Sequence, residues 1–111
     1  MFLENMSKVF FNEQSEQDLS DIVVGLLLWT KVAITEEEAH RYADDIYDMA
    51  QSIPDLFNHK KCQYDIHRQY GEYQLNYKRN RRTTWYIIYD IEPNSGNILI
   101  NKIISNHMTI E

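Results

Sequence analysis

The stretch from Tyr70 to His107 most constrains what this 111-residue chain can fold into. It contains three runs rich in aromatic and β-branched residues, separated by the basic segment Lys78–Arg82 and the turn sequence Pro93-Asn-Ser-Gly96. Strand-forming runs divided by short turns are typical of an antiparallel meander. The last third of the chain is therefore predicted to form three consecutive antiparallel strands.

Side-chain alternation indicates which faces of these strands are covered. In the first run Tyr73, Leu75 and Tyr77 alternate with polar residues that include Gln74, which predicts one buried and one polar face. The other two runs carry apolar residues on both faces, which is typical of central strands covered on both sides. The predicted same-face sets are Trp85, Ile87, Tyr89 and Ile91 in the second run, and Ile98, Ile100, Lys102 and Ile104 in the third.

The first half of the chain reads as a short strand followed by two helices. Val9-Phe-Phe11 is the predicted strand, and helical spacing begins at Ser15 and runs to about Trp29 or Lys31. A second helix opens at Thr35, with Glu38 three residues on as in a capping box, and ends at Pro54. Its apolar stripe comprises Ala39, Tyr42, Ala43, Ile46, Met49, Ala50 and Ile53.

The connections complete this expected order. Only a few residues join the two helices, so an antiparallel helical hairpin is expected. The stretch 55–69 is polar and lacks a clear period. It is interpreted as a connection with one turn of helix or an edge strand.

Composition and charge narrow the functional classes. The net charge of −6 argues against general affinity for nucleic acid. The charge is uneven, because residues 1–54 hold eleven Asp or Glu and three Lys or Arg, whereas residues 55–111 hold six and eight. A local basic patch could still bind phosphate once contact is made.

The predicted location is the cytoplasm. The single cysteine, Cys62, rules out an internal disulfide and fits a reducing compartment. No apolar run approaches the roughly 20 residues that a membrane span needs, and the N-terminus lacks the regions of a signal peptide. Met6 is a second candidate start, with the preceding residues as an unstructured leader.

The order of these segments resembles the RelE/ParE superfamily of bacterial toxins, and the similarity extends to local motifs. Val9–Leu19 is similar to the family's opening, an apolar strand followed by an acidic helix start and Asp-Leu. Tyr70–Tyr77 resembles its Gly-x-Tyr-Arg-x-x-Tyr strand. Further similar segments are Ala39–Ile53 for the second helix, Trp85–Tyr89 and Asn97–Ile100 for the last hairpin, and Asn106-His107 for the histidine or tyrosine near the end of many members.

The resemblance implies a single α+β domain spanning residues 1–111, with residues 1–6 as a flexible leader. Its element order is β-α-α-β-β-β, and its helical hairpin packs on one face of a twisted antiparallel β-sheet. The implied function is the toxin of a type II toxin–antitoxin system, as in plasmid stabilisation proteins. RelE-type members cut mRNA on the ribosome and ParE-type members poison DNA gyrase, and a cognate antitoxin protein neutralises both.

Candidate site residues follow from the basic segment and the chain end. Members of the family carry an arginine in each of two strands. The first corresponds to Gln74 of this chain and the second falls near Tyr86, and neither position is cationic here. The remaining groups for RNA cleavage, which needs a base, an acid and a cation for the phosphorane, are Tyr86, His107 and Arg82. The candidates for binding RNA or a partner are Lys78, Arg79, Arg81, Arg82 and Lys102.

Three functional hypotheses therefore stand, and the sequence leaves open whether the chain is an enzyme. The preferred one is a toxin that binds a macromolecular target. The second is a ribosome-dependent mRNA endonuclease with a rearranged site. The third is a non-toxic family member that serves as an interaction module. For the basic segment itself, the alternative to a binding or catalytic role is a solvated turn whose cations protect a sheet edge from aggregation.

No metal or cofactor is expected. His59, Cys62 and His67 do not have the spacing of a zinc site. Cys62 also lacks a motif that would supply a catalytic partner. The acidic face of the second helix is most simply a solvated surface.

Overall fold

The computed structural model describes residues 7–29 and 33–107. The predicted leader at residues 1–6 and the extension of the first helix to Lys31 lie outside these ranges. The elements are β1 (Val9–Phe11), α1 (Glu13–Trp29), α2 (Glu36–Gln51), the 3-10 turn η1 (Ile53–Asp55), β2 (Lys60–Lys61), α3 (Asp65–Arg68), β3 (Tyr73–Lys78), β4 (Thr84–Ile91) and β5 (Ile98–Ser105). The fold is therefore α+β, with the predicted order of elements plus β2 and α3 inserted before the meander.

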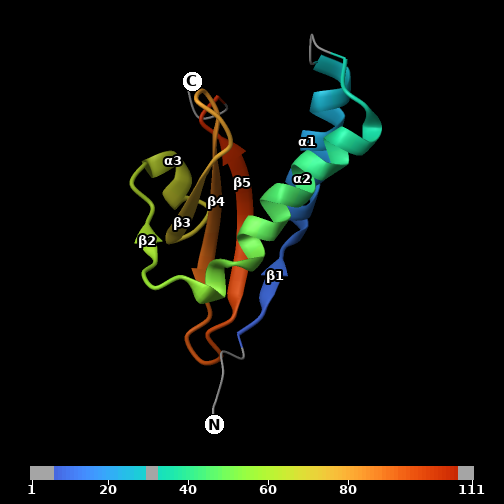
Figure 1. Cartoon of the computed structure of the whole chain (residues 1–111). Coiled ribbons are helices and arrows are strands. Elements are labelled where there is room, and N and C mark those ends of the chain that lie inside the picture. Colours follow the sequence, from blue (N-terminus) through green and yellow to red (C-terminus); the bar gives the residue numbers. More distant parts are fainter. Residues whose placement is uncertain (1–6, 30–32, 108–111) are drawn as a thin grey trace.

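One five-stranded sheet runs in the order β1-β5-β4-β3-β2 (Figure 1). The predicted meander is present, since β3, β4 and β5 pair antiparallel. The expectation of a wholly antiparallel sheet is wrong, because β1 pairs parallel to β5 with Val9 opposite Ile98. Short turns dictate the direction of β3 to β5, whereas β1 reaches the sheet through no such turn, so no local sequence signal sets its direction.

The two long helices begin at side-chain caps. Asn12 Oδ1 accepts the N–H of Ser15 at 2.8 Å, so α1 starts at Glu13, slightly before the predicted position. The predicted capping box is present at α2, where Thr35 Oγ1 accepts the N–H of Glu38 and Glu38 accepts that of Thr35. Pro54 lies within η1, just after α2 ends at Gln51.

The main core lies between the helical hairpin and one face of the sheet. Figure 1 shows α1 and α2 side by side along this face, with the far end of the hairpin projecting beyond the strands. The predicted α2 stripe supplies Ile46 and Ala50, and β4 supplies Trp85, Ile87 and Tyr89. Burial of these large side chains, about 1.5–3 kcal/mol each, provides most of the drive to fold.

The opposite face of the sheet is covered by the segment that contains β2 and α3. Cys62, Ile88 and Ile104 form a second buried cluster there, with Tyr70 and Tyr86 packed against it. The stretch predicted as a turn of helix or an edge strand therefore supplies both. The polar face predicted for β3 is wrong at Gln74, which is buried because α3 lies over it.

A β-bulge changes the faces of β5. Ile100 is opposite Tyr89 and Lys102 is opposite Ile88, so Asn101 is the extra residue. Beyond the bulge Ile103 enters the main core and Ile104 the second cluster. The predicted grouping of Ile98, Ile100, Lys102 and Ile104 on one face is therefore wrong after Ile100.

None of the helices within the described ranges is long and apolar enough to cross a membrane.

Candidate functional site

Three cations stand out from the end of the sheet where β3 turns into β4. Lys78, Arg81 and Arg82 are exposed, and none of them forms an ion pair within residues 7–29 and 33–107. We call the segment Lys78–Thr83 the basic loop. Its charge is prominent because the whole chain carries a net charge of −6.

Backbone and side-chain hydrogen bonds give the basic loop a defined shape. The carbonyl of Thr83 accepts the N–H groups of Arg79 at 2.9 Å and Asn80 at 3.3 Å. The side chain of Asn80 in turn accepts the N–H groups of Arg82 at 2.9 Å and Thr83 at 3.0 Å. Asparagine commonly closes turns in this way. The loop is therefore ordered before any ligand arrives.

The end of β5 brings His107 to the same loop. His107 Nε2 lies 3.1 Å from Thr83 Oγ1. Asn106 donates from Nδ2 to the carbonyl of Arg82 and accepts the N–H of Thr84 on Oδ1, both at 3.0 Å. Of the three predicted catalytic residues, Arg82 and His107 are thus brought to one place although 25 positions separate them.

Arg79 belongs to the basic loop but does not present its charge freely. Its guanidinium forms an ion pair with Asp45 of α2, donates to the Tyr77 hydroxyl at 3.0 Å and lies 4.2 Å from the centre of the Tyr42 ring. Burial alone lowers the pKa of Arg79, but the bonds to Asp45 and Tyr77 outweigh it and raise the pKa above its usual value. Arg79 is therefore a permanently charged contact between the loop and the helical hairpin.

Tyr86 lies apart from this group. Its ring faces the side of the sheet covered by α3, 4.5 Å from the His67 ring. Burial, with a smaller contribution from Tyr64, raises the pKa of Tyr86. The hydroxyl is a poor proton acceptor near neutral pH for that reason.

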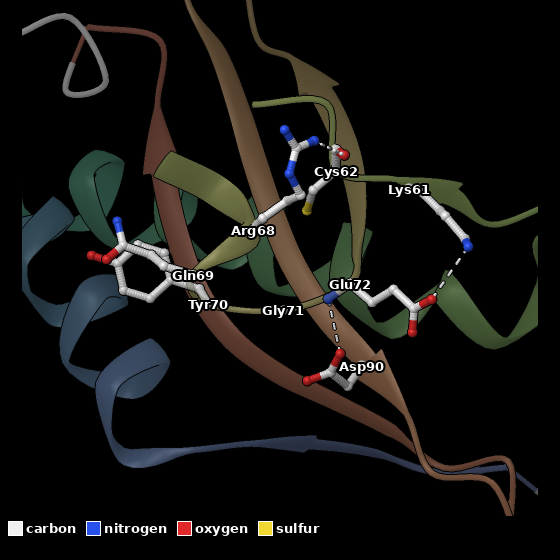
Figure 2. A pocket seen from close by; sticks show the side chains of 8 residues that line it. All are labelled: Lys61, Cys62, Arg68, Gln69, Tyr70, Gly71, Glu72 and Asp90. Atoms are coloured by element: carbon white, nitrogen blue, oxygen red, sulfur yellow. Dashed lines mark hydrogen bonds and ion pairs between the residues drawn. The ribbon is translucent and has the colours of Figure 1, made fainter. Parts of the chain in front are cut away.

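An open hollow of about 630 Å³ lies beside α3, lined by Cys62, Arg68, Gly71, Asp90 and their neighbours (Figure 2). Its charged groups are already engaged. Arg68 pairs with Asp65 and donates to the Cys62 carbonyl at 3.1 Å, and Asp90 accepts the N–H of Glu72 at 2.9 Å. Burial raises the pKa of the Cys62 thiol despite the nearby Arg68, which disfavours the nucleophilic thiolate.

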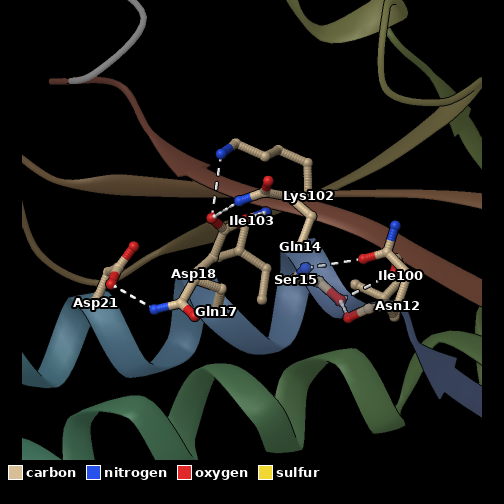
Figure 3. Close-up of polar contacts among 9 residues, drawn as sticks. All are labelled: Asn12, Gln14, Ser15, Gln17, Asp18, Asp21, Ile100, Lys102 and Ile103. Atoms are coloured by element: carbon tan, nitrogen blue, oxygen red, sulfur yellow. Dashed lines mark hydrogen bonds and ion pairs between the residues drawn. The ribbon is translucent and has the colours of Figure 1, made fainter.

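Lys102, a predicted binding residue, is bound within the fold instead (Figure 3). Its Nζ lies 3.1 Å from Asp18 Oδ1, and its side chain is only 18% exposed. Asp18 also accepts the Ile103 N–H at 2.8 Å and the Gln14 amide at 2.9 Å. β1 pairs with β5 only as far as Ile100. Beyond that point Asp18 of α1, rather than a residue of β1, accepts a hydrogen bond from the β5 backbone at Ile103.

Two further histidines, His59 and His67, are hydrogen-bonded within the fold. His59 Nδ1 lies 2.7 Å from the Tyr89 hydroxyl, and His67 is fully buried with Nδ1 3.3 Å from Gln74 Oε1. Among the described residues, no group of three or more His, Cys, Asp or Glu could hold a metal ion.

Sequence reasoning missed the residues that hold this site in place. Asp45 and Asp18 counted only as charges of the two helices, Asn80 only as part of the basic segment, and Asn106 only as part of the motif near the chain end. The Asn80 turn had a local signal in the Asn-x-x-Thr spacing of the loop. The two carboxylates had none, because their partners lie 34 and 84 positions away.

Comparisons of the chain with protein-family models, with curated proteins and with solved structures find no match.

Proposed function

We propose that this chain is the toxin of a bacterial type II toxin–antitoxin pair. It binds a macromolecular target through the basic loop, and a cognate antitoxin protein holds it inactive in the cytoplasm. The observation that carries the proposal is the grouping of Lys78, Arg81 and Arg82 beside His107 on one ordered loop of an otherwise acidic chain. Unpaired cations on a preformed loop bind phosphate or acidic groups with little ordering cost.

The order of the elements supports the same proposal. A strand, a helical hairpin and an antiparallel meander follow one another as the RelE/ParE resemblance implies. β2 and α3 are additions to that order, and they cover the face of the sheet opposite the hairpin. They leave the basic loop uncovered at the end of the sheet.

The helical hairpin offers a surface suited to a protein partner such as an antitoxin. A groove of about 360 Å³ runs between α1 and α2, and its lining includes Val23, Val24, Ala43 and Tyr47. Val24 and Tyr47 remain 47% and 43% exposed, and Leu28 remains 66% exposed. Neighbouring apolar side chains left in water commonly mark an interaction site.

Induced expression in a bacterial host tests the toxin proposal. The wild-type chain should arrest growth, and Arg81→Ala with Arg82→Ala should relieve the arrest at equal protein level. The matched control is Lys60→Ala with Lys61→Ala, which removes two exposed cations from β2. Growth unaffected by the wild-type chain would sink the proposal in favour of a non-toxic interaction module.

A second candidate, ribosome-dependent cleavage of mRNA, is favoured by one observation. Asn106 donates to the backbone carbonyl of Arg82, and His107 contacts the next residue, Thr83, so both candidate residues belong to one part of the basic loop. In such cleavage the ribose 2′-oxygen attacks the adjacent phosphorus and the bond to the 5′-oxygen breaks. His107 would move a proton on one of these oxygens and Arg82 would stabilise the phosphorane charge.

The products separate the two candidates. The endonuclease predicts codon-positioned mRNA fragments with cyclic 2′,3′-phosphate and 5′-hydroxyl ends, which His107→Ala with Arg82→Ala abolishes. Binding to DNA gyrase predicts DNA damage with intact mRNA. Mapping of 5′ ends and a DNA-damage reporter in the same arrested culture distinguish them.

A further inference from the structure

The basic loop is joined to the rest of the molecule on two sides. On one side Asn106 bridges the Arg82 carbonyl and the Thr84 N–H at the end of the sheet. On the other side Arg79 reaches Asp45, which lies in the middle of α2. The second contact crosses from the sheet layer to the helical layer.

The surroundings of Arg79 make this contact more than a surface ion pair. The Tyr42 ring lies under the guanidinium, and the Tyr42 hydroxyl accepts a hydrogen bond from Trp85 Nε1 at 3.0 Å. Trp85 is buried in the main core and is paired with Tyr77, whose hydroxyl also accepts from Arg79. The Arg79 side chain is 27% exposed and the Asp45 side chain 40%. The Asp45 carboxylate, the Tyr77 hydroxyl and the Tyr42 ring thus contact one guanidinium.

We propose that Arg79 is a positioning residue, whose tether to Asp45 and Tyr42 orients the basic loop so that Lys78, Arg81 and Arg82 face the target together. Arg79 itself is turned toward α2 and does not contact the target. This inference rests on the proposed function only in treating the loop as the target-binding surface. The tether and its effect on the loop can be measured whether or not the chain is a toxin.

Two explanations of how the basic loop binds its target, by charge alone or by an oriented loop, predict opposite effects of the substitution Asp45→Asn. Asp45→Asn changes the net charge from −6 to −5 and releases Arg79 as a fourth free cation. By charge alone this variant should act more strongly on a target that binds cations. If the tether orients the loop, the variant should act more weakly, because the loop must now be ordered on binding.

Limited proteolysis measures the tether directly. Trypsin cleaves after Lys and Arg, and its rate on a locally opening segment follows the population of the open form. Asp45→Asn should speed cleavage within residues 78–82 about three- to tenfold, the range expected when an ion pair and a cation–π contact are both lost. Mass spectrometry of the fragments locates the cuts.

Two matched variants act as controls. Asp48→Asn makes the same charge change one turn along α2 at an exposed residue and should leave the cleavage rate unchanged. Asp45→Glu keeps the carboxylate and should restore protection. An Asp45→Asn loop that is cut no faster than the wild-type loop would overturn the proposal, as would equal acceleration by Asp48→Asn.

Growth arrest supplies the functional arm. Asp45→Asn should reduce the arrest at equal protein level although it adds positive charge, Asp45→Glu should retain it, and Asp48→Asn should match the wild type. Stronger arrest by Asp45→Asn would overturn positioning in favour of simple charge. If the wild-type chain does not arrest growth, the proposed function fails, while the proteolysis result still decides the tether.

Discussion

The edge of β5 and the basic loop each contain a cation bonded to a helix carboxylate, but the two pairs have different consequences. At the β5 edge Lys102 and Asp18 are 18% and 7% exposed, and Asp18 also accepts a backbone and a side-chain amide. At the loop Arg79 and Asp45 are 27% and 40% exposed, and three neighbouring cations have no such partner among the described residues. One pair is almost shielded from solvent against the sheet, and the other, in our proposal, orients a surface.

The depth of burial explains the difference. Removing one partner of a buried pair leaves a charge without water or counter-charge, which costs several kcal/mol. A half-exposed pair is screened by solvent and contributes little to stability. A cation–carboxylate pair can therefore stabilise the fold at the β5 edge and orient a loop at the end of the sheet.

The largest effect is expected from Asp18→Ala at the β5 edge. The substitution leaves the Lys102 ammonium and the Ile103 N–H without their acceptor, and should lower the free energy of unfolding by about 3 kcal/mol. Urea denaturation followed by circular dichroism measures it. Asp21→Ala, which removes an exposed carboxylate one turn along α1, is the control and should stay within about 0.5 kcal/mol of wild type. Equal losses in both variants would mean that Asp18 is an ordinary surface residue.

His67 offers a third case beside the two ion pairs, because it is a fully buried titratable group with no charged partner among the described residues. Burial lowers the pKa of His67 below 6.5, against a smaller opposing effect of the Gln74 hydrogen bond. As the pH falls below about 6.5 the unfolded chain therefore takes up this proton first, and the free energy of unfolding decreases until the lowered pKa of the folded state is passed. The slope for one proton cannot exceed about 1.4 kcal/mol per pH unit.

Denaturation of the wild type and of His67→Gln at pH 7.5 and pH 5.5 measures this contribution. Glutamine keeps a hydrogen-bonding side chain at this position but cannot take up the proton. The variant should lose less stability than the wild type between the two pH values. Identical losses would show that His67 does not contribute.

A smaller effect is expected from Asp45→Ala at the loop. The pair with Arg79 is partly exposed, so its loss should lower the free energy of unfolding by only about 0.5–1 kcal/mol. The same denaturation assay as for Asp18→Ala allows a direct comparison. A loss as large as that of Asp18→Ala would remove the distinction between the two pairs.

The smallest effect on stability is expected from neutralising the three exposed cations. Lys78→Ala with Arg81→Ala and Arg82→Ala should change the free energy of unfolding by no more than about 0.5 kcal/mol, because none of the three holds an ion pair within the described ranges. Thermal unfolding at two salt concentrations checks this. A loss above 2 kcal/mol would indicate that these side chains hold the fold rather than face a target.

Much of the fold was accessible from local patterns. The α2 stripe and its Thr35 cap and the three meander strands each follow from periodicity or turn chemistry that acts over a few residues. The bulge at Asn101 was not accessible, because Asn101 is held by the Tyr70 carbonyl and Asp90, which lie far away in sequence. That one residue moved Ile103 and Ile104 to faces opposite to those predicted.

The candidate site divides in the same way. The sequence by itself determined that the cations cluster between two strands, since Lys78, Arg79, Arg81 and Arg82 are nearly contiguous. Only the tertiary structure decided which of the predicted cations remain free. Lys102 and Arg79 are paired with carboxylates of α1 and α2, whereas Lys78, Arg81 and Arg82 are exposed and have no carboxylate partner within residues 7–29 and 33–107. Charge is a property of the residue, but its availability depends on which distant groups the fold brings within a few ångströms.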